Sequence, residues 1–425
     1  MTSASGLQRP PALAGEIEVS RLANGLELCL VRNPQAPLVT SALFYRAGSR
    51  DEPPGRGGLA HFLEHLMFKG SERYGPGEID RRTQALGGTN NAFTSHDVTA
   101  YWFTFAADRW SEALAIEADR MRGLRLDPRE VDAERQVILE EIAMYRDEPW
   151  DALEMDVLAA LYPGHPYGRP VLGTEAELEG EDVAAVAAFH RDYYRPDNAV
   201  LVLAGDLGAD AAARAEEAFS ALAAGRAERP RVVPPEREGV GVVRRERRQG
   251  EVTRMLLTLP APPPDTADHA GLRILATILA AGRASRLQRS LVEEGQLCLS
   301  VSASLADNVV ASHFAIAAEL VPGADLPEVE RRIFEALAEL GTAAVGDEEL
   351  ERARHVFAAD WAWGQERIHQ QAVAAGLALA EFDLDQPHRL LTAALDADAG
   401  GLARLAARFL DARAGGVLGV SRAAE

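Results

Sequence analysis

The chain has 425 residues, of which 47% are hydrophobic and 26% are charged. At this length and apolar content we expect about two to four folded domains rather than a disordered chain. Its 44 Lys and Arg against 65 Asp and Glu give a formal net charge of −21. So acidic a chain lacks the basic surface that nucleic-acid binding needs, and we expect no nucleic-acid partner.

The sequence carries neither a secretory nor a membrane-spanning signature. Its start lacks the apolar stretch of about 7 to 15 residues of a secretory signal, and no later run reaches the length of about 18 apolar residues of a membrane helix. We therefore expect a cytoplasmic protein without a membrane partner, or a periplasmic one if a signal has been removed. Cys29 and Cys298 form no disulfide framework, and we expect buried thiols.

In chain order, the predicted elements of the first 145 residues alternate strand and helix. Apolar and β-branched residues cluster between turn signals such as Asn24-Gly25 where we predict strands, and apolar residues recur at helical spacing where we predict helices. The predicted elements are strands at 26–32 and 38–46, a helix at 59–68, a strand-like stretch at 89–105, and helices at 107–125 and 128–145. Asp127-Pro128 supplies a cap and a first-turn proline for the last helix.

A stretch rich in Pro, Gly and charge, 224–249, predicts a linker between two cores, 1–223 and 250–425. The second core repeats the element order of the first, with a strand at 252–262, a helix at 269–281, and strands at 297–307 and 312–320. We therefore predict an α+β protein of two tandem homologous domains, each a mixed, mostly antiparallel sheet packed with helices.

The sequence His61-Phe-Leu-Glu64-His65 places two imidazoles at positions i and i+4. On a helix both side chains point to one face about one turn apart, so they can share a metal ion. The alternative is an amphipathic core helix with two hydrogen-bonded histidines. A chance match to this spacing is rare in a chain with only 10 His, so we favour a zinc site.

Zinc in hydrolytic sites takes three protein ligands, and a carboxylate is the expected third. The predicted helix at 128–145 offers Glu134, Glu140 and Glu141. Glu134 and Glu141 are seven residues apart and share a face, whereas Glu140 points about 100° away from Glu141. Periodicity alone leaves all three open, and each is alternatively a solvated surface charge.

Several motifs follow one another in a fixed order: GGLAHFLEHLMFKG, LGGTNNAFTSHDVTAYW, ERQVILEEI, HPYGRPVLGT and FHRDYYRPDNAVLVLAGD. Together they resemble the pitrilysin and insulinase metallopeptidases, which include the subunits of mitochondrial processing peptidase and carry an inverted zinc motif, His-x-x-Glu-His. The resemblance implies a half-clamshell fold of the processing-peptidase kind. It also implies one zinc ion per chain, held by a catalytic domain at 1–223, and no metal in the domain at 250–425.

By this resemblance the zinc ligands are His61, His65 and Glu141, which lies about 76 residues after the second histidine. Glu64 matches the general base that takes a proton from water as it attacks a peptide carbonyl. Glu134 matches a carboxylate that hydrogen-bonds a ligand histidine and fixes its tautomer. The alternative for Glu134 is a solvated helix carboxylate.

The residues Asn91, Ala92 and Phe93 resemble the substrate-binding edge strand of the family, to which an extended peptide adds through main-chain hydrogen bonds. The alternative is an ordinary strand with alternating core and surface positions. Three further histidines are candidate metal ligands that we expect to be structural: His96, His165 and His190.

Two residues that related enzymes use are missing from the second domain. Those enzymes employ an Arg and, seven residues later, a Tyr to grip the substrate and stabilise the oxyanion. Alignment puts Val292 and Leu299 at these positions, and all eight tyrosines lie at or before Tyr194. Arg286 or Arg289 could replace the Arg. We therefore expect a heterodimer in which a homologous subunit without the zinc motif supplies the Arg and Tyr, with a homodimer as the alternative.

The leading prediction is a zinc-dependent endopeptidase that hydrolyses unfolded or short peptides in an enclosed chamber, whose acidic walls favour basic substrates. One alternative is a non-catalytic structural subunit, like the core proteins of respiratory complexes that share the processing-peptidase fold. Another is a protein dedicated to binding or processing one precursor peptide. The intact zinc motif and Glu141 favour the peptidase.

Overall fold

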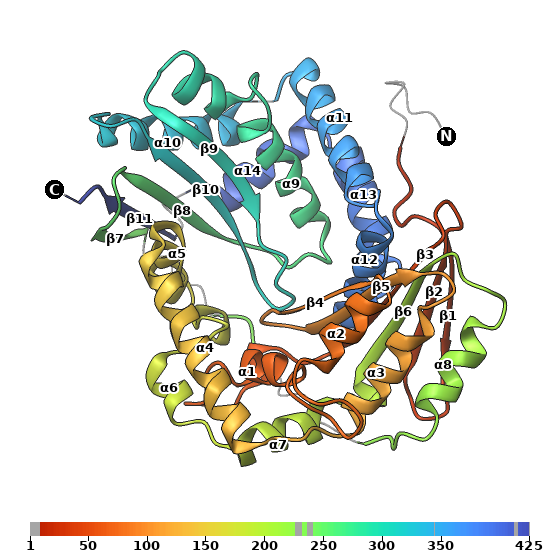
Figure 1. The fold of residues 1–425 in the computed structure, drawn as a ribbon. Coiled ribbons are helices and arrows are strands. Elements are labelled where there is room, and N and C mark those ends of the chain that lie inside the picture. The colour runs from red at the N-terminus through yellow and green to blue at the C-terminus, as the bar shows by residue number, and fades with distance from the viewer. Residues whose placement is uncertain (1–8, 226–231, 236–240, 344, 412–414, 425) are drawn as a thin grey trace.

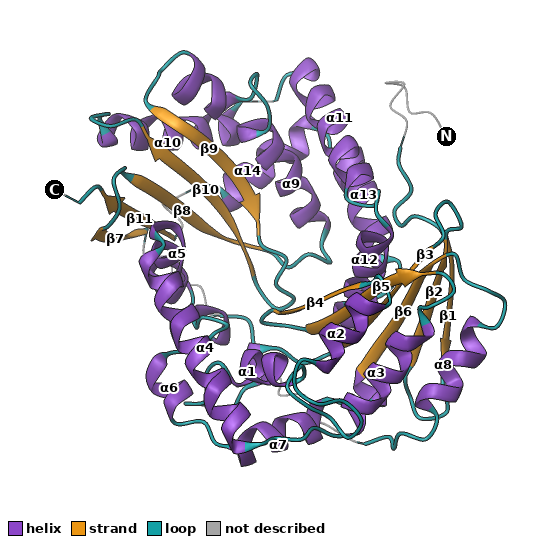
Figure 2. Cartoon of the chain, in the orientation of Figure 1, coloured by secondary structure: helices purple, strands orange, loops and turns teal. Residues whose placement is uncertain are grey.

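Two sheets, one from each half of the chain, organise the structure (Figure 1). The computed structural model describes residues 9–225, 232–235, 241–343, 345–411 and 415–424. Helices pack on both sheets, and strands and helices mix throughout the chain (Figure 2). None of the described helices is both long enough and apolar enough to cross a membrane.

The helices and strands that the sequence predicts lie close to their predicted positions, and the structure adds others that the sequence analysis did not predict. The stretch 89–105 is a hairpin of two strands, β4 and β5, rather than one continuous element. The first half contains β1 (Glu16–Arg21), β2 (Glu27–Arg32), β3 (Leu38–Tyr45), α1 (Leu59–Leu66), α2 (Glu78–Ala85), β4 (Thr89–Thr94), β5 (Thr99–Ala106), α3 (Ser111–Arg122), α4 (Pro128–Asp147), α5 (Pro149–Leu161), α6 (Glu175–Glu179), α7 (Val183–Tyr193), β6 (Ala199–Gly205) and α8 (Ala211–Phe219). The second half contains β7 (Val242–Arg248), β8 (Arg254–Ala261), α9 (Ala267–Ala280), a π-helical turn (Gln288–Glu293), β9 (Cys298–Leu305), β10 (Ser312–Leu320), α10 (Leu326–Thr342), α11 (Asp347–Trp363), α12 (Ile368–Glu381), α13 (Gln386–Asp396), α14 (Ala399–Phe409) and β11 (Gly416–Arg422).

The two sheets have related topologies. The first has the strand order β1-β2-β6-β3-β5-β4, and the second has β7-β11-β8-β10-β9. One pair in each sheet is parallel, β2 with β6 and β7 with β11, and the remaining neighbours are antiparallel. The predicted α+β class, with two tandem and mostly antiparallel sheets, is therefore confirmed. β4 and β9 lie at corresponding edges of the two sheets.

Both faces of the first sheet are buried, and β2 shows how. Side chains alternate across a strand, so Leu28 and Leu30 enter the core shared with α1, α3, α4 and α7, whereas Cys29 and Val31 enter a second core on the opposite face. This two-sided burial explains the nearly continuous apolar run of β2. Cys29 and Cys298 are buried free thiols, as predicted.

Each half of the chain lends one helix to the sheet of the other half. α12 comes from the second half but covers the outer face of the first sheet, and Gly376 lets it approach the ring of Phe44 (Figure 1). In exchange, α5 comes from the first half and covers the second sheet, where Leu153 and Val157 pack over Gly419 of β11. Because each sheet is completed by a helix of the other half, the two halves share their cores.

The predicted linker, 224–249, extends too far at its C-terminal end. β7 lies inside that range and pairs in parallel with β11, so residues 242–248 belong to the second sheet. The sequence VVRRERR was misread because β7 is an edge strand whose exposed charges give it the composition of a solvated linker. Residues 226–231 and 236–240 of the predicted linker lie outside the described residues. The division into 1–223 and 250–425 otherwise stays a prediction.

We expect Gly376→Ala to destabilise the protein, although alanine is the better helix former by about 1 kcal/mol. A Cβ at this position would lie 2.1 Å from Cε2 of Phe44, whose ring is fully buried. Such overpacking costs about 1–3 kcal/mol, which urea unfolding would register as a lower midpoint. The control is Gly123→Ala, because a Cβ there meets nothing within 4 Å. An unchanged midpoint for Gly376→Ala would contradict the close packing of α12 on β3.

Candidate metal centre

The zinc motif lies on α1, whose position is fixed at its N-terminus. Gly58 precedes the helix with φ +88°, and a Cβ there would lie 2.3 Å from the carbonyl oxygen of Leu172, so only glycine fits. The amide of Ala60 in the first turn donates to the buried carboxylate of Glu52 at 2.9 Å. Apolar side chains on one side of α1 are buried in the first core, which leaves the motif residues at the opening of a cavity.

The third ligand comes from α4, which packs against α1. This helix begins with Asp127 as N-cap, whose carboxylate accepts from the amide of Arg129 at 2.9 Å, followed by a proline in the first turn. Glu134 and Glu141 face α1, whereas Glu140 is exposed on another side of the helix. The structure therefore brings Glu134 and Glu141, and not Glu140, to the histidines of α1.

Three donor atoms converge between α1 and α4. Oε2 of Glu141 lies 3.9 Å from Nε2 of His61 and 3.7 Å from Nε2 of His65, and the three ligand atoms lie within 4.8 Å of one another. Two imidazole nitrogens and one carboxylate oxygen are a donor set that zinc takes in catalytic sites, where three protein ligands leave one position open. The residues present therefore fit one zinc ion.

A second carboxylate orients one of these ligands. Nδ1 of His65 donates to Oε1 of Glu134 at 2.8 Å, which directs Nε2 of the same ring toward Glu141. Glu134 is buried, with its side chain 6% exposed, so the alternative of a solvated helix carboxylate is wrong. Its other oxygen, Oε2, lies 2.6 Å from Nζ of Lys69. Lys69 was missed as a site residue, although its position four residues after His65 repeats the spacing of the two histidines.

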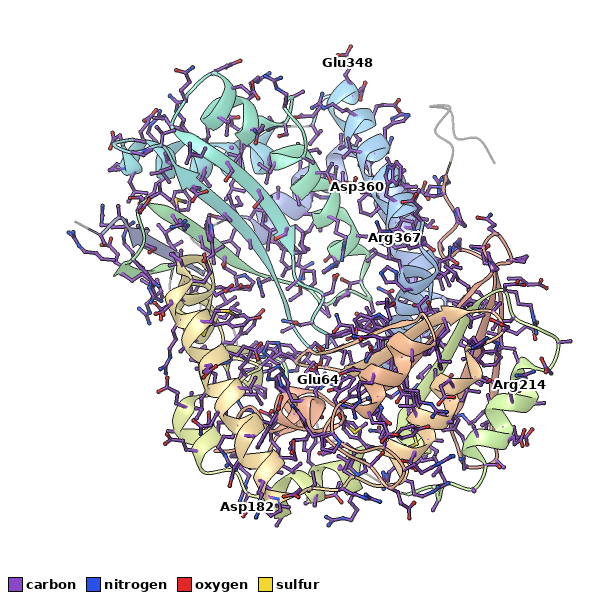
Figure 3. All side chains as sticks on the ribbon, in the orientation of Figure 1. Glu64, Asp182, Arg214, Glu348, Asp360 and Arg367 are labelled. Atoms are coloured by element: carbon purple, nitrogen blue, oxygen red, sulfur yellow. The ribbon has the colours of Figure 1, made fainter. Side chains whose placement is uncertain are left out.

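Glu64 lies on α1 next to β4 (Figure 3). Oγ1 of Thr94, the last residue of β4, donates to Oε2 of Glu64 at 2.5 Å. This hydrogen bond engages Oε2 of Glu64 and fixes the orientation of the carboxylate. Oε1 is the oxygen that Thr94 does not bind. The carboxylate of Glu64 is therefore positioned beside the metal ligands without being one of them.

The electrostatics of the site differ between its two histidines. Burial, with a smaller contribution from His65, lowers the pKa of His61 to about 3, so this imidazole is neutral at physiological pH. Burial also acts to lower the pKa of His65, but the hydrogen bond to Glu134 and nearby carboxylate charges outweigh it and raise the pKa. Burial raises the pKa of Glu64 against the opposing hydrogen bond from Thr94. A raised pKa makes this carboxylate a stronger base toward the proton of a water molecule.

The metal ligands open onto a cavity of about 520 Å³. Ala92 and Phe93 of β4 line it, whereas Asn91 is exposed on the same strand and does not. β4 is the last strand of its sheet, so within the described residues its outer edge has no strand partner. On the opposite side, Asp151 and Glu154 of α5 add negative charge to the cavity wall.

The turn after β4 is held by contacts from the second half of the chain. Asp97 accepts a hydrogen bond from the amide of Val309 at 3.1 Å and another from the hydroxyl of Tyr167 at 2.8 Å. The same hydroxyl accepts from the amide of Val310 at 3.0 Å. Because Val309 and Val310 belong to the β9–β10 connection, the second domain braces the edge strand at the site.

The three additional histidines are engaged with the backbone. Nε2 of His96 lies 3.1 Å from the carbonyl oxygen of Arg169, and Nε2 of His190 lies 2.9 Å from that of Arg120. Nδ1 of His165 accepts from the amide of Tyr167 at 3.1 Å. Among the described residues, the only group of metal-ligating side chains close enough to share an ion is the one on α1 and α4.

Apolar side chains, Val292 and Leu299, occupy the positions of the missing Arg and Tyr. Val292 lies in the π-helical turn and packs against the core of the second half, and Leu299 is 53% exposed on β9. Arg286 makes two 2.8 Å hydrogen bonds to Glu349, so its guanidinium is already occupied. Arg289 is an exposed residue 3.7 Å from a neighbouring glutamate. Neither arginine lines the cavity of the metal ligands.

A His-x-x-Glu-His helix joined by a glutamate from a second helix, in a tandem α+β fold, defines the inverted-motif class of zinc metallopeptidases. Residues 28–175 match the family model described as insulinase (peptidase family M16), and residues 182–357 match the model described as peptidase M16 inactive domain. The chain belongs to the insulinase, or M16, family of peptidases. The resemblance predicted from its motifs is thus confirmed.

Relatives cover most of the chain. A protein of Mycobacterium tuberculosis named as an uncharacterized zinc protease is 33% identical over 341 residues, which span 78% of this chain and 77% of that protein. The crystal structure of a protease from Helicobacter pylori has a TM-score of 0.90 at 25% identity and covers 95% of this chain and 99% of that one. A structure from Pseudomonas fluorescens, described as a peptidase M16 inactive domain, has a TM-score of 0.86 at 17% identity and covers 96% of this chain and 98% of that one. At this identity the match shows similarity of fold alone.

We expect Glu141→Gln to weaken zinc binding by about 100-fold or more, since the loss of a ligand exceeds the 10- to 100-fold effect typical of groups behind the ligands. Competition with a chromophoric chelator measures the dissociation constant. The matched control is Glu140→Gln, which removes the same charge from the adjacent, exposed position of α4. Equal affinities for the two variants would exclude Glu141 as a ligand.

Proposed function

We propose that this protein is a zinc-dependent endopeptidase that hydrolyses unfolded or short peptides in an enclosed chamber. The observation that carries the proposal is the convergence of two histidines and Glu141 on one point, with Glu64 beside them. Along the same cavity runs β4, whose outer edge has no strand partner among the described residues. The names of its relatives as zinc proteases support the metal and the class of reaction.

The geometry supports a division of tasks among the side chains. When bound, zinc supplies Lewis-acid chemistry, lowering the pKa of a coordinated water toward about 7 and polarising the scissile carbonyl. Because Thr94 holds Oε2 of Glu64, Oε1 is the atom that takes the proton from the attacking water. The same oxygen then delivers that proton to the leaving amine. His65 stays oriented through its hydrogen bond to Glu134.

The edge of β4 suits an extended peptide. A substrate strand adds to the sheet through main-chain hydrogen bonds, with its backbone running past Ala92 and Phe93 toward the metal ligands. Main-chain binding requires an unfolded segment and reads little of the side-chain sequence, which accords with unfolded or short substrates. The carboxylates of Asp151 and Glu154 in the cavity wall favour substrates with basic side chains.

The proposal includes a partner subunit. Val292 and Leu299 stand where related enzymes have an Arg and a Tyr, and Arg286 is bound to Glu349. A homologous subunit without the zinc motif would supply both missing groups, and the two chains would enclose the chamber. A homodimer would enclose a chamber without them.

A second candidate function is a non-catalytic structural subunit, which the missing Arg and Tyr favour and the assembled ligand set disfavours. A protein dedicated to one precursor peptide would have the same site with slower turnover. The compartment proposed from the sequence is the cytoplasm.

We expect the zinc-loaded chain to hydrolyse an unstructured, internally quenched basic peptide in a chelator-sensitive reaction. Glu64→Gln should reduce kcat by about 10²- to 10⁴-fold, the usual contribution of a general base, while retaining zinc because Glu64 is not a ligand. Fluorescence assays with metal analysis on both proteins measure the two effects. Zinc bound without any turnover, alone or with a companion chain, would favour the structural subunit.

The partner hypothesis predicts that restoring the missing groups makes this chain more active without a companion, as a homodimer in which each copy presents them to the site of the other. Val292→Arg combined with Leu299→Tyr should raise kcat/KM at least about 10-fold, since one oxyanion-stabilising donor is often worth 10²- to 10³-fold. Val292→Arg combined with Leu299→Phe is the control, because it adds the ring without the hydroxyl. If the Tyr variant gains nothing over the Phe variant, the hypothesis of a supplied phenol is wrong.

A further inference from the structure

Lys69 is the only lysine among the 44 basic residues of the chain, and it lies directly behind the candidate zinc site. Its ammonium nitrogen is 2.6 Å from Oε2 of Glu134, while Oε1 of the same carboxylate accepts from Nδ1 of His65 at 2.8 Å. Each oxygen of Glu134 is thus engaged by a different residue. The three side chains form a continuous chain of contacts from an ammonium group to a metal-ligand imidazole.

The local backbone explains why Lys69 reaches this position. His61, His65 and Lys69 are spaced four residues apart, so they follow one face of a helix. α1 ends at Leu66, but the chain continues through a tighter turn in which the amide of Lys69 donates to the carbonyl of Leu66 at 3.0 Å. This extension keeps the lysine side chain on the side of α4, in line with the two histidines.

Lys69 balances the negative charge of Glu134. The side chain of Glu134 is only 6% exposed, and a buried carboxylate is costly unless a positive charge compensates it. An imidazole that ligates a metal is neutral and offers Glu134 an N–H but no charge. A bound zinc ion would add positive charge on the far side of the imidazole, but the cation in direct contact with Glu134 is Lys69.

The choice of lysine in an arginine-rich chain is consistent with this task. An ammonium group is a compact point charge that can bind a single carboxylate oxygen. A guanidinium presents a planar fork that prefers both oxygens of a carboxylate. At Glu134 such a fork would compete with His65 for Oε1, whereas Lys69 leaves that oxygen to the imidazole.

We propose that Lys69 is a positioning residue of the zinc site: it holds Glu134 by Oε2, so that Oε1 fixes the ring of His65 with Nε2 directed at the metal. This inference rests on the proposed zinc site and adds a residue to it. Lys69 belongs neither to the group of candidate ligands nor to the cavity lining, and its ion pair is with Glu134, so its effect on zinc passes through Glu134.

The test is a double-mutant cycle on zinc affinity, read by competition with a chromophoric chelator rather than by activity. We expect Lys69→Met to weaken zinc binding by about 10- to 100-fold, the range found for groups that orient a ligand. In a Glu134→Gln background the same substitution should change affinity by less than about 2-fold, because the residue through which it acts is already altered. Arg73→Met, which removes one positive charge from an exposed position in the next turn, is the matched control and should bind zinc like the wild type.

A structural role would give a different pattern. Because Lys69 balances a buried carboxylate, Lys69→Met should also lower the thermal unfolding midpoint of the zinc-free protein, so zinc affinities are compared at a temperature at which both proteins are folded. A purely structural role would weaken zinc binding equally in the presence and absence of Glu134→Gln. If Lys69→Met unfolds, Lys69→Gln, which keeps a hydrogen-bond donor without the charge, replaces it in the cycle. Unchanged zinc affinity in the single variant, or an equal loss with and without Glu134→Gln, would overturn the inference while leaving the zinc site standing. Failure of the wild type itself to bind zinc would overturn the proposed function as well.

Discussion

The contact between α1 and α4 is the constraint on which the site depends. One helix supplies two imidazoles and the other a carboxylate, and the ligand atoms lie within 4.8 Å of one another although they come from separate parts of the chain. The helices can approach this closely because apolar residues on both are buried in the first core, which also anchors them to the sheet. The ion pair of the buried Glu134 and the half-buried Lys69 lies at the same interface. The α1–α4 interface therefore determines the packing of the two helices, the charge balance of Glu134 and the geometry of the candidate ligands.

Hydrogen bonds around the α1–α4 contact also fix the position of β4, the proposed substrate-binding edge strand. Thr94 ties the end of β4 to Glu64, and Asp97, three residues later, is bonded to Val309 of the second half. The edge strand is thus held between the candidate base on one side and the neighbouring domain on the other. The second half of the chain therefore contributes to the site by bracing its edge strand.

Much of the site could be predicted from the sequence because its chemistry follows helical spacing. The i, i+4 histidines identified α1, and the seven-residue spacing of Glu134 and Glu141 placed both on one face; the resemblance to the insulinase family then selected Glu141 over Glu140, which the structure shows exposed. Lys69 follows the same periodicity, but a single lysine in an arginine-rich chain points first to codon usage, so the sequence alone assigns it no role in the site.

Other features could not be predicted, because they depend on contacts distant in sequence. Whether Asn91 or Ala92 faces the cavity depends on the register of β4 against β5, and the structure exposes Asn91. β7 resembled a linker since the charges of an edge strand and of a solvated loop look alike in composition. No local sequence signal predicts that each sheet is covered by a helix of the other half. The amphipathic pattern of α5 or α12 shows which face of the helix is buried, but not which sheet it packs on.

That exchange of helices makes the two repeats inseparable as folding units. If the chain were divided between the repeats, the first piece would carry α5 without its sheet and would expose the face of β3 and β6 that α12 covers. The second piece would lose the cover over β11 in the same way. Although the sequence reads as two copies of one domain, neither copy can complete its hydrophobic core alone, and unfolding should proceed as a single cooperative transition.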